Sequence, residues 1–174
     1  MTQIANWSAY SSWPVLLLSI LIVDVVVMFM VRYVPLGSAV NTWYDRFGLL
    51  AVLADVLSIA IGFAVARWIY STWFSSSGLL TFFAILVGFQ CLHDALFYFG
   101  VIQPIPRGTN AMIDVFKQYG VEGGAGIIAF DASMMVASGG IFLGLEQLSP
   151  PLQWFIGLLT LYTMSFVLYT KKGG

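Results

Sequence analysis

The chain has 174 residues, of which 60% are hydrophobic and only 9% are charged. A soluble domain normally carries about 25% charged residues, so this chain is too poor in charge to cover a water-facing surface. The net charge of −1 excludes a basic field for nucleic acid, and the single Cys91 excludes an internal disulfide and a CxxC metal or redox motif. We therefore expect one domain in a lipid bilayer.

Five apolar stretches are each long enough to cross a membrane, which takes a helix of about 20 residues. They cover residues 14–34, 47–70, 78–101, 124–145 and 152–170. Pro14 suits the first turn of a helix, and Ser149-Pro150-Pro151 forces a turn before the last stretch. The sequence thus predicts an all-α, polytopic membrane bundle of five transmembrane helices, with residues 1–174 forming a single transmembrane domain.

The one long connection between two predicted spans covers residues 102–123. Within it, residues 110–119 have the pattern of a short amphipathic helix. Its apolar face carries Met112, Ile113, Phe116 and Tyr119. Such a helix is expected to lie flat at the membrane surface, and a plain connecting role explains the pattern as well as a gating role does.

The distribution of Lys and Arg predicts the orientation. With five spans, one side of the membrane receives six of the seven basic residues and the other side receives only Arg67. The six are Arg32, Arg46, Arg107, Lys117, Lys171 and Lys172. Because basic residues accumulate on the inner side, the N-terminus is expected outside and the C-terminus inside. Trp43 falls on the inner side and is expected to mark that interface, as tryptophans often do.

Four carboxylates lie inside four different apolar stretches, and one histidine lies beside one of them. They are Asp24, Asp55, Asp94, Asp131 and His93. An ionisable group at bilayer depth costs several kcal/mol and is a candidate functional site.

The helical rise of about 1.5 Å per residue allows the depths of these acids to be compared. Asp55, Asp94 and Asp131 all lie roughly 10–12 Å from the inner ends of their spans, and Asp24 lies slightly deeper. Gln90 precedes Asp94 by four residues and so shares its helix face. We therefore expect these side chains and His93 to form one ion or proton site.

Four ionised carboxylates at this depth need neutralisation, and Arg67 lies about 18 Å along its own helix from Asp55. Either several acids hold protons, or a cation lies among them, or a water-filled cavity reaches them. Oxygen ligands favour a hard divalent cation such as Mg²⁺, Ca²⁺ or Mn²⁺. If a metal binds, its expected ligands are Asp55, Asp94, Asp131 and His93. The alternative is that each acid pairs separately with a hydroxyl or carbonyl and joins two helices.

Small residues favour close packing of helices in two places. One stripe consists of Ala51, Asp55, Ser58, Gly62 and Ala66, and Gly140 and Gly144 form a GxxxG element. These patterns predict contacts between helices of one chain or between copies in a homo-oligomer.

Three functions fit these observations. The first is the handling of protons or cations by a channel, carrier or ion-binding protein. The second is a structural or scaffolding role, with the acids as hydrogen-bonding links between helices. The third is an enzyme with two intramembrane aspartates. The enzyme is disfavoured because Tyr44-Asp45 is expected in a loop, Phe130-Asp131 lacks the glycines of an intramembrane aspartyl protease, and other catalytic motifs are absent from the sequence.

Two segments carry a resemblance to known sequences. The first is Trp43-Tyr44-Asp45-Arg46-Phe47-Gly48 leading into Ala54-Asp55-Val56-Leu57; the second is His93-Asp94-Ala95-Leu96-Phe97-Tyr98 leading through Pro106-Arg107-Gly108-Thr109-Asn110 to Ile113-Asp114-Val115-Phe116-Lys117. Over about residues 43–135 the chain resembles small uncharacterised integral membrane proteins of large DNA viruses of algae and protists. The resemblance implies a viral or host-derived membrane and implies no activity.

Overall fold

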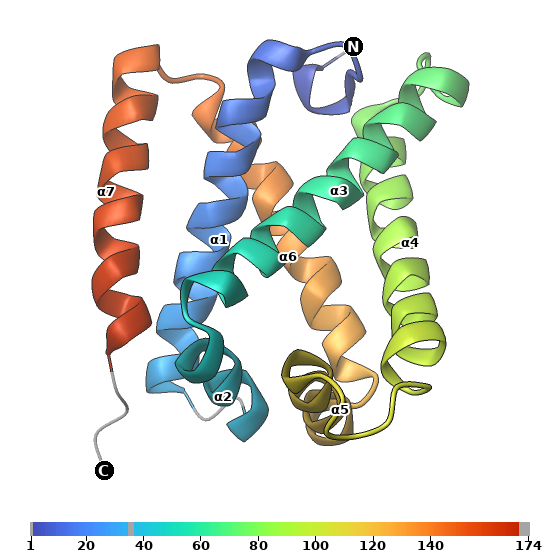
Figure 1. Ribbon diagram of the computed structural model, residues 1–174. Coiled ribbons are helices and arrows are strands. Elements are labelled where there is room, and N and C mark those ends of the chain that lie inside the picture. The colour runs from blue at the N-terminus through green and yellow to red at the C-terminus, as the bar shows by residue number, and fades with distance from the viewer. Residues whose placement is uncertain (1, 35–36, 171–174) are drawn as a thin grey trace.

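The computed structural model describes residues 2–34 and 37–170, and all regular structure within them is helical (Figure 1). The seven α-helices are α1 (Trp13–Tyr33), α2 (Ser38–Phe47), α3 (Leu49–Trp73), α4 (Leu79–Phe97), α5 (Ala111–Gly123), α6 (Gly126–Leu145) and α7 (Pro150–Tyr169). Two 3₁₀ turns, η1 (Gln3–Ala5) and η2 (Tyr10–Ser12), precede α1, and a π-helical segment, η3 (Tyr98–Ile102), extends α4. The predicted all-α class is confirmed.

Five of these helices are long and apolar enough to cross a membrane: α1, α3, α4 together with η3, α6 and α7. They agree with the five predicted spans to within three residues at either end. The two remaining helices, α2 and α5, lie at the end of the bundle opposite the N-terminal segment (Figure 1). We call this the α2–α5 end. The C-terminal end of α7 lies there too, as an odd number of spans requires.

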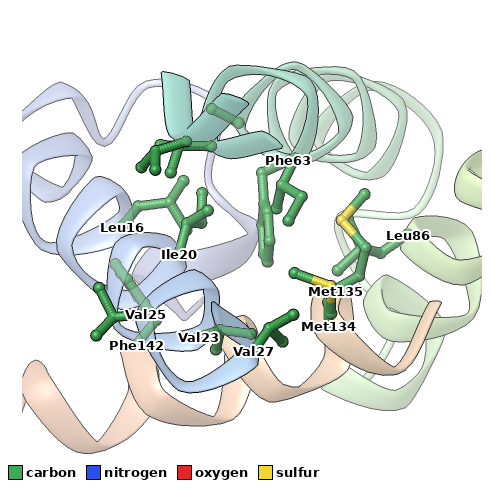
Figure 2. Close-up of a cluster of buried hydrophobic side chains, with 14 of the residues drawn as sticks. Leu16, Ile20, Val23, Val25, Val27, Phe63, Leu86, Met134, Met135 and Phe142 are labelled. Atoms are coloured by element: carbon green, nitrogen blue, oxygen red, sulfur yellow. The ribbon is translucent and has the colours of Figure 1, made fainter. Parts of the chain in front are cut away.

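Four spans form the body of the bundle. Helix α1 packs against α6 and α3, α3 packs against α4, and α4 packs against α6, whereas α7 lies outside this group against α1. Buried apolar side chains of α1, α3, α4 and α6 pack together in the interior of the bundle (Figure 2). Phe63, Leu86, Met135 and Phe142 are among the largest of them. These side chains form the core of the bundle.

Helix α2 was not predicted, and the expectation that Tyr44-Asp45 lies in a loop was wrong. Gly37 and Gly48 bracket the helix with φ angles of 126° and 53°, which residues with a Cβ rarely adopt. Its first backbone N–H groups, those of Ser38 and Ala39, donate to the carboxylate of Glu122 on α5. Because this cap comes from a residue more than 80 positions away, the start of the helix cannot be predicted from the residues next to it.

The short helix predicted at 110–119 is confirmed and is longer, since α5 continues to Gly123. Asn110 caps it by accepting hydrogen bonds from the N–H groups of Met112 and Ile113. Helix α5 packs mainly against α2, and together they cover the α2–α5 end of the four-helix body.

The expected GxxxG contact is not made within the described part of the chain. Gly140 and Gly144 are exposed, and a Cβ added at either would meet no other atom within 4 Å. Gly139 faces the bundle instead and lies against the ring of Phe83. One position along a helix turns the side chain by about 100°, so the packed face of α6 lies beside the face that the motif marks.

Candidate functional site

A cavity of about 680 Å³ lies between α3, α4 and α6 at the α2–α5 end, where α2, α5 and η3 complete its wall. Of the predicted site residues, five line it: Asp55, Gln90, His93, Asp94 and Asp131. Asp24 does not line it, but it is connected to the cavity wall through Tyr44. The acids predicted to lie at one level therefore come from three different spans and share one cavity.

Tyr44 joins Asp24 and Asp55. Its hydroxyl lies 3.1 Å from Oδ1 of Asp24 and 3.2 Å from Oδ2 of Asp55. One hydroxyl has one hydrogen and can donate to only one of the two carboxyl groups at a time. The second contact is favourable only if that carboxyl group carries a proton and donates to the Tyr44 oxygen. The geometry thus implies that, besides the hydroxyl hydrogen of Tyr44, one proton is held by one of the two carboxyl groups.

The hydroxyl of Tyr44 itself stays protonated. Burial, followed by the charges of Asp55 and Asp24, raises the pKa of Tyr44 well above its ordinary value of 10. Asp24 is fully buried, and its second oxygen, Oδ2, has no hydrogen-bond partner among the described residues.

Trp43 does more than mark an interface, and its expected interfacial position stays a prediction. Trp43 is buried, and its indole N–H donates to Oδ2 of Asp55 at 2.9 Å. Its ring packs against Phe47 and Phe116. Trp43 and Tyr44 are thus site residues that sequence reasoning missed. One sequence feature could have indicated them. Two adjacent aromatic residues with hydrogen-bond donors, an indole N–H and a phenol O–H, come just before the span that contains Asp55.

Asp94 is bound by residues of its own helix. Gln90 donates its amide N–H to Oδ1 of Asp94 at 2.8 Å, as their spacing predicted, and Nδ1 of His93 lies 3.2 Å from the same oxygen. Oδ2 of Asp94 is buried without a partner in the described chain. The His93 side chain is 40% exposed against 17% for Asp94, and its ring stacks on Phe97. His93 therefore stands at the edge of the cavity rather than inside it.

Asp131 differs from the other acids because its carboxyl group accepts no hydrogen bond from any described residue. It faces the cavity from α6. Tyr119 of α5 lines the same cavity. Burial, and then the charges of Asp131, Asp55 and Asp94, raise the pKa of Tyr119 above its ordinary value. The three acids thus act on a single hydroxyl across the cavity.

The expected metal ligands are not clustered in the described chain. Among the described residues, no group of three or more His, Cys, Asp or Glu side chains is arranged to hold a metal ion. Asp55, Asp94 and Asp131 line the cavity from three different helices, α3, α4 and α6, whereas a divalent cation needs its oxygen ligands within about 2.0–2.6 Å of one point. The described residues thus give no support to the predicted ligand set of these acids and His93, which stays a prediction.

Neither arginine of the described spans neutralises these acids. Arg32 pairs with Asp45 at 2.6 Å and donates to the carbonyl of Leu168 at 3.0 Å. Arg67 is fully buried in the N-terminal half of the bundle, where it donates to the carbonyl of Ile4 and lies over the ring of Trp13. The negative charge of the cavity is left to protons or to a bound cation.

Comparison of the chain with protein-family models, with curated proteins and with solved structures found no match. The resemblance to viral membrane proteins stays a prediction.

Proposed function

We propose that this protein is an integral membrane protein that takes up protons or cations into the cavity between α3, α4 and α6. The observation that carries the proposal is Asp131, a carboxyl group that faces a cavity inside a membrane bundle and has no partner in the described chain. Carboxylates at such depth commonly belong to ion pathways or proton relays.

The balance of hydrogen-bond acceptors and donors supports this proposal. Oδ2 of Asp24, Oδ2 of Asp94 and the carboxyl group of Asp131 have no donors in residues 2–34 and 37–170. The donors that do reach the acids come from Trp43, Tyr44, Gln90 and, depending on its tautomer, His93. A buried acceptor without a donor costs about 1–3 kcal/mol, so water, protons or a cation are needed to complete the site.

The alternative proposal is a scaffolding protein of a viral or host-derived membrane. The Asp24–Tyr44–Asp55 contacts favour it for those two acids, because they link α1, α2 and α3 through hydrogen bonds. Asp131 weighs against it, since a carboxyl group without a partner links nothing. The contacts therefore separate Asp24 and Asp55, which Tyr44 links between helices, from Asp94 and Asp131, which make no side-chain hydrogen bond to another helix of the described chain.

We also propose that the α2–α5 end faces the inside, with the N-terminus outside. Arg46, Arg107 and Lys117 lie on α2, on α5 or in the segment before α5, at this end of the bundle. Lys171 and Lys172 lie outside the described residues. Arg67, the only basic residue expected on the other side, belongs to the opposite half of the bundle.

The test is flux into liposomes that contain the purified protein. Proton entry is followed with a trapped pH-sensitive dye under a potassium diffusion potential, and monovalent cation entry is followed with rubidium. The parent is expected to carry at least one of these fluxes, and Asp131→Asn and Asp94→Asn are expected to lower it at least about tenfold. Asp114→Asn is the matched control, because Asp114 lies on α5 outside the cavity. Equal flux in the parent, Asp131→Asn and Asp94→Asn rejects the proposal.

A further inference from the structure

We propose that the cation taken up by this cavity is an organic ammonium ion with an apolar body, rather than a bare metal ion. The inference rests on the proposed function and gives the chemical class of its cargo. It follows from the size of the cavity, from the chemistry of its wall and from Asp94 and Asp131, whose carboxyl groups lack donors from other helices of the described chain.

The cavity is far larger than a metal ion requires. At about 30 Å³ for each water molecule, about 680 Å³ would hold roughly 20 waters. Pockets of about 300–1,000 Å³ are typical of sites for small organic molecules. The described residues also contain no cluster able to coordinate a metal ion.

The wall is largely aromatic and aliphatic. Rings reach the cavity from α2, α4, η3, α5 and α6, and they belong to Trp43, Phe97, Tyr98, Phe116, Tyr119 and Phe130. Aromatic faces attract organic cations through the ring quadrupole, by about 0.5–2 kcal/mol for each favourable contact. Such a wall also buries hydrocarbon, which a metal ion or a proton does not need.

The polar groups of the wall favour a positively charged ligand over an anionic one. Neither Lys nor Arg is among the residues that line the cavity, so an anionic ligand would find no counter-charge there. Among the described residues, Asp131 on α6 has no hydrogen-bond partner, and Asp94 on the adjacent α4 keeps Oδ2 buried and without a donor. These carboxyl groups need a group that donates N–H or carries positive charge. The geometry places the ammonium group at Asp94 and Asp131 and the apolar body among the rings.

The test is equilibrium binding of N,N-dimethylbenzylammonium to the purified full chain in detergent at pH 7. Isobutylbenzene, in which carbon replaces the charged nitrogen, is the neutral control. The cation is expected to bind at least about tenfold more tightly than isobutylbenzene, which corresponds to about 1.4 kcal/mol. Sodium, potassium and magnesium ions are expected to compete weakly.

Variants assign the binding to the named groups. Asp131→Asn and Asp94→Asn are expected to weaken binding of the cation at least about tenfold, as removal of a desolvated charge partner does. Asp131→Glu, which keeps the charge, and Asp114→Asn, outside the cavity, are expected to stay within about threefold of the parent. Phe116→Leu is expected to weaken binding several-fold through loss of a ring. The parent-like elution of each variant in size-exclusion chromatography establishes that it is folded.

The outcomes separate this inference from the proposed function. If the cation does not bind, or binds the parent and the folded Asp131→Asn and Asp94→Asn variants equally, the inference is wrong. An Asp131-dependent flux of protons or rubidium would then still support the proposed function. If binding and flux both lack any dependence on Asp131 and Asp94, both proposals fall.

Discussion

Tyr44 is the residue that connects Asp24 to Asp55. Its one hydroxyl lies between two carboxyl groups from different spans, α1 and α3, although Tyr44 itself belongs to neither span. Removing that hydroxyl leaves both acids without this partner. Asp55 would keep the indole N–H of Trp43, whereas the side chain of Asp24 would keep no hydrogen bond to the described chain.

Tyr44→Phe is therefore expected to lower the free energy of unfolding in detergent by about 1–3 kcal/mol, the cost of leaving a buried acceptor unsatisfied. The measurement is reversible denaturation followed by circular dichroism. Tyr162→Phe is the control, because Tyr162 is exposed on α7 and its hydroxyl makes no hydrogen bond to the described chain. A loss of stability no larger for Tyr44→Phe than for Tyr162→Phe would show that the bridge contributes nothing.

The two buried arginines bind backbone carbonyls rather than the acids of the cavity. Arg32 and Arg67 each donate to a backbone carbonyl, those of Leu168 and Ile4. Each thereby joins a segment distant in sequence to the bundle. Within the described chain neither is paired with an intramembrane acid, so these cations stabilise the fold without neutralising the acids of the cavity.

At the scale of the element, Glu122 holds the α2–α5 layer together. Its carboxylate accepts hydrogen bonds from the N–H groups of Ser38 and Ala39, from the Ser38 hydroxyl and from Gln118. These bonds, the one from Ala39 foremost, lower the pKa of Glu122 from 4.5 to about 2. Glu122 thus serves as the N-cap of a helix to which it does not belong.

This lowered pKa predicts a pH dependence of stability. The folded state favours ionised Glu122, so its contribution is complete above pH 4.5 and is lost as the pH falls toward about 2. Glu122→Gln is expected to be less stable than the parent at pH 6, and the two are expected to converge as the pH falls. The difference should remain below about 1 kcal/mol, because solvent screens this exposed side chain. A difference that is constant from pH 6 to pH 3 would contradict this account.

The neighbouring glycines of α6 allow a matched test of helix packing. Gly139→Ala places a Cβ against the ring of Phe83, whereas Gly140→Ala places one in open space. Both changes improve helix propensity equally, by about 1 kcal/mol. Gly139→Ala is therefore expected to be less stable than Gly140→Ala by about 1–3 kcal/mol, the usual cost of overpacking. The measurement is the midpoint of thermal denaturation in detergent. Equal midpoints would mean that α6 is not packed on α4 as described.

The π-helical segment η3 also serves the cavity. The N–H of Gln103 donates to the carbonyl of Tyr98 at 2.9 Å, five residues back, and Lys117 binds the Gln103 carbonyl at 3.0 Å. The wider turn brings Tyr98 against Gly120 of α5, where a Cβ would lie 2.6 Å from the ring. Single π-helical turns of this kind are frequent at functional sites.

At the scale of the whole molecule, the sequence predicts the features that depend on one continuous segment, namely the spans and the depth of a residue within each span. Each span is a continuous apolar stretch, so its length alone identifies it. The depth of an acid follows from counting residues along one helix, which is why Asp55, Asp94 and Asp131 could be placed at one level.

The remaining features depend on distances between elements, which the sequence does not give. The start of α2 depends on Glu122, so Trp43 and Tyr44 could not be placed beside Asp55. The predicted metal ligands find no support in the described residues for the same reason. A common depth does not tell whether three carboxyl groups converge on one point or stand on separate walls of a cavity.

The bridge made by Tyr44 also bears on how the protein is made. Ribosomes release α1 before α2, so the first span meets the translocon while the partner of Asp24 is still 20 residues from being available. A lone aspartate at the centre of a span opposes insertion by about 2.5–3.5 kcal/mol. The first span is the most apolar of the five, which offsets this cost. Its high content of Leu, Ile and Val therefore favours insertion of the span at the stage when Asp24 still lacks the hydroxyl of Tyr44 as its neighbour.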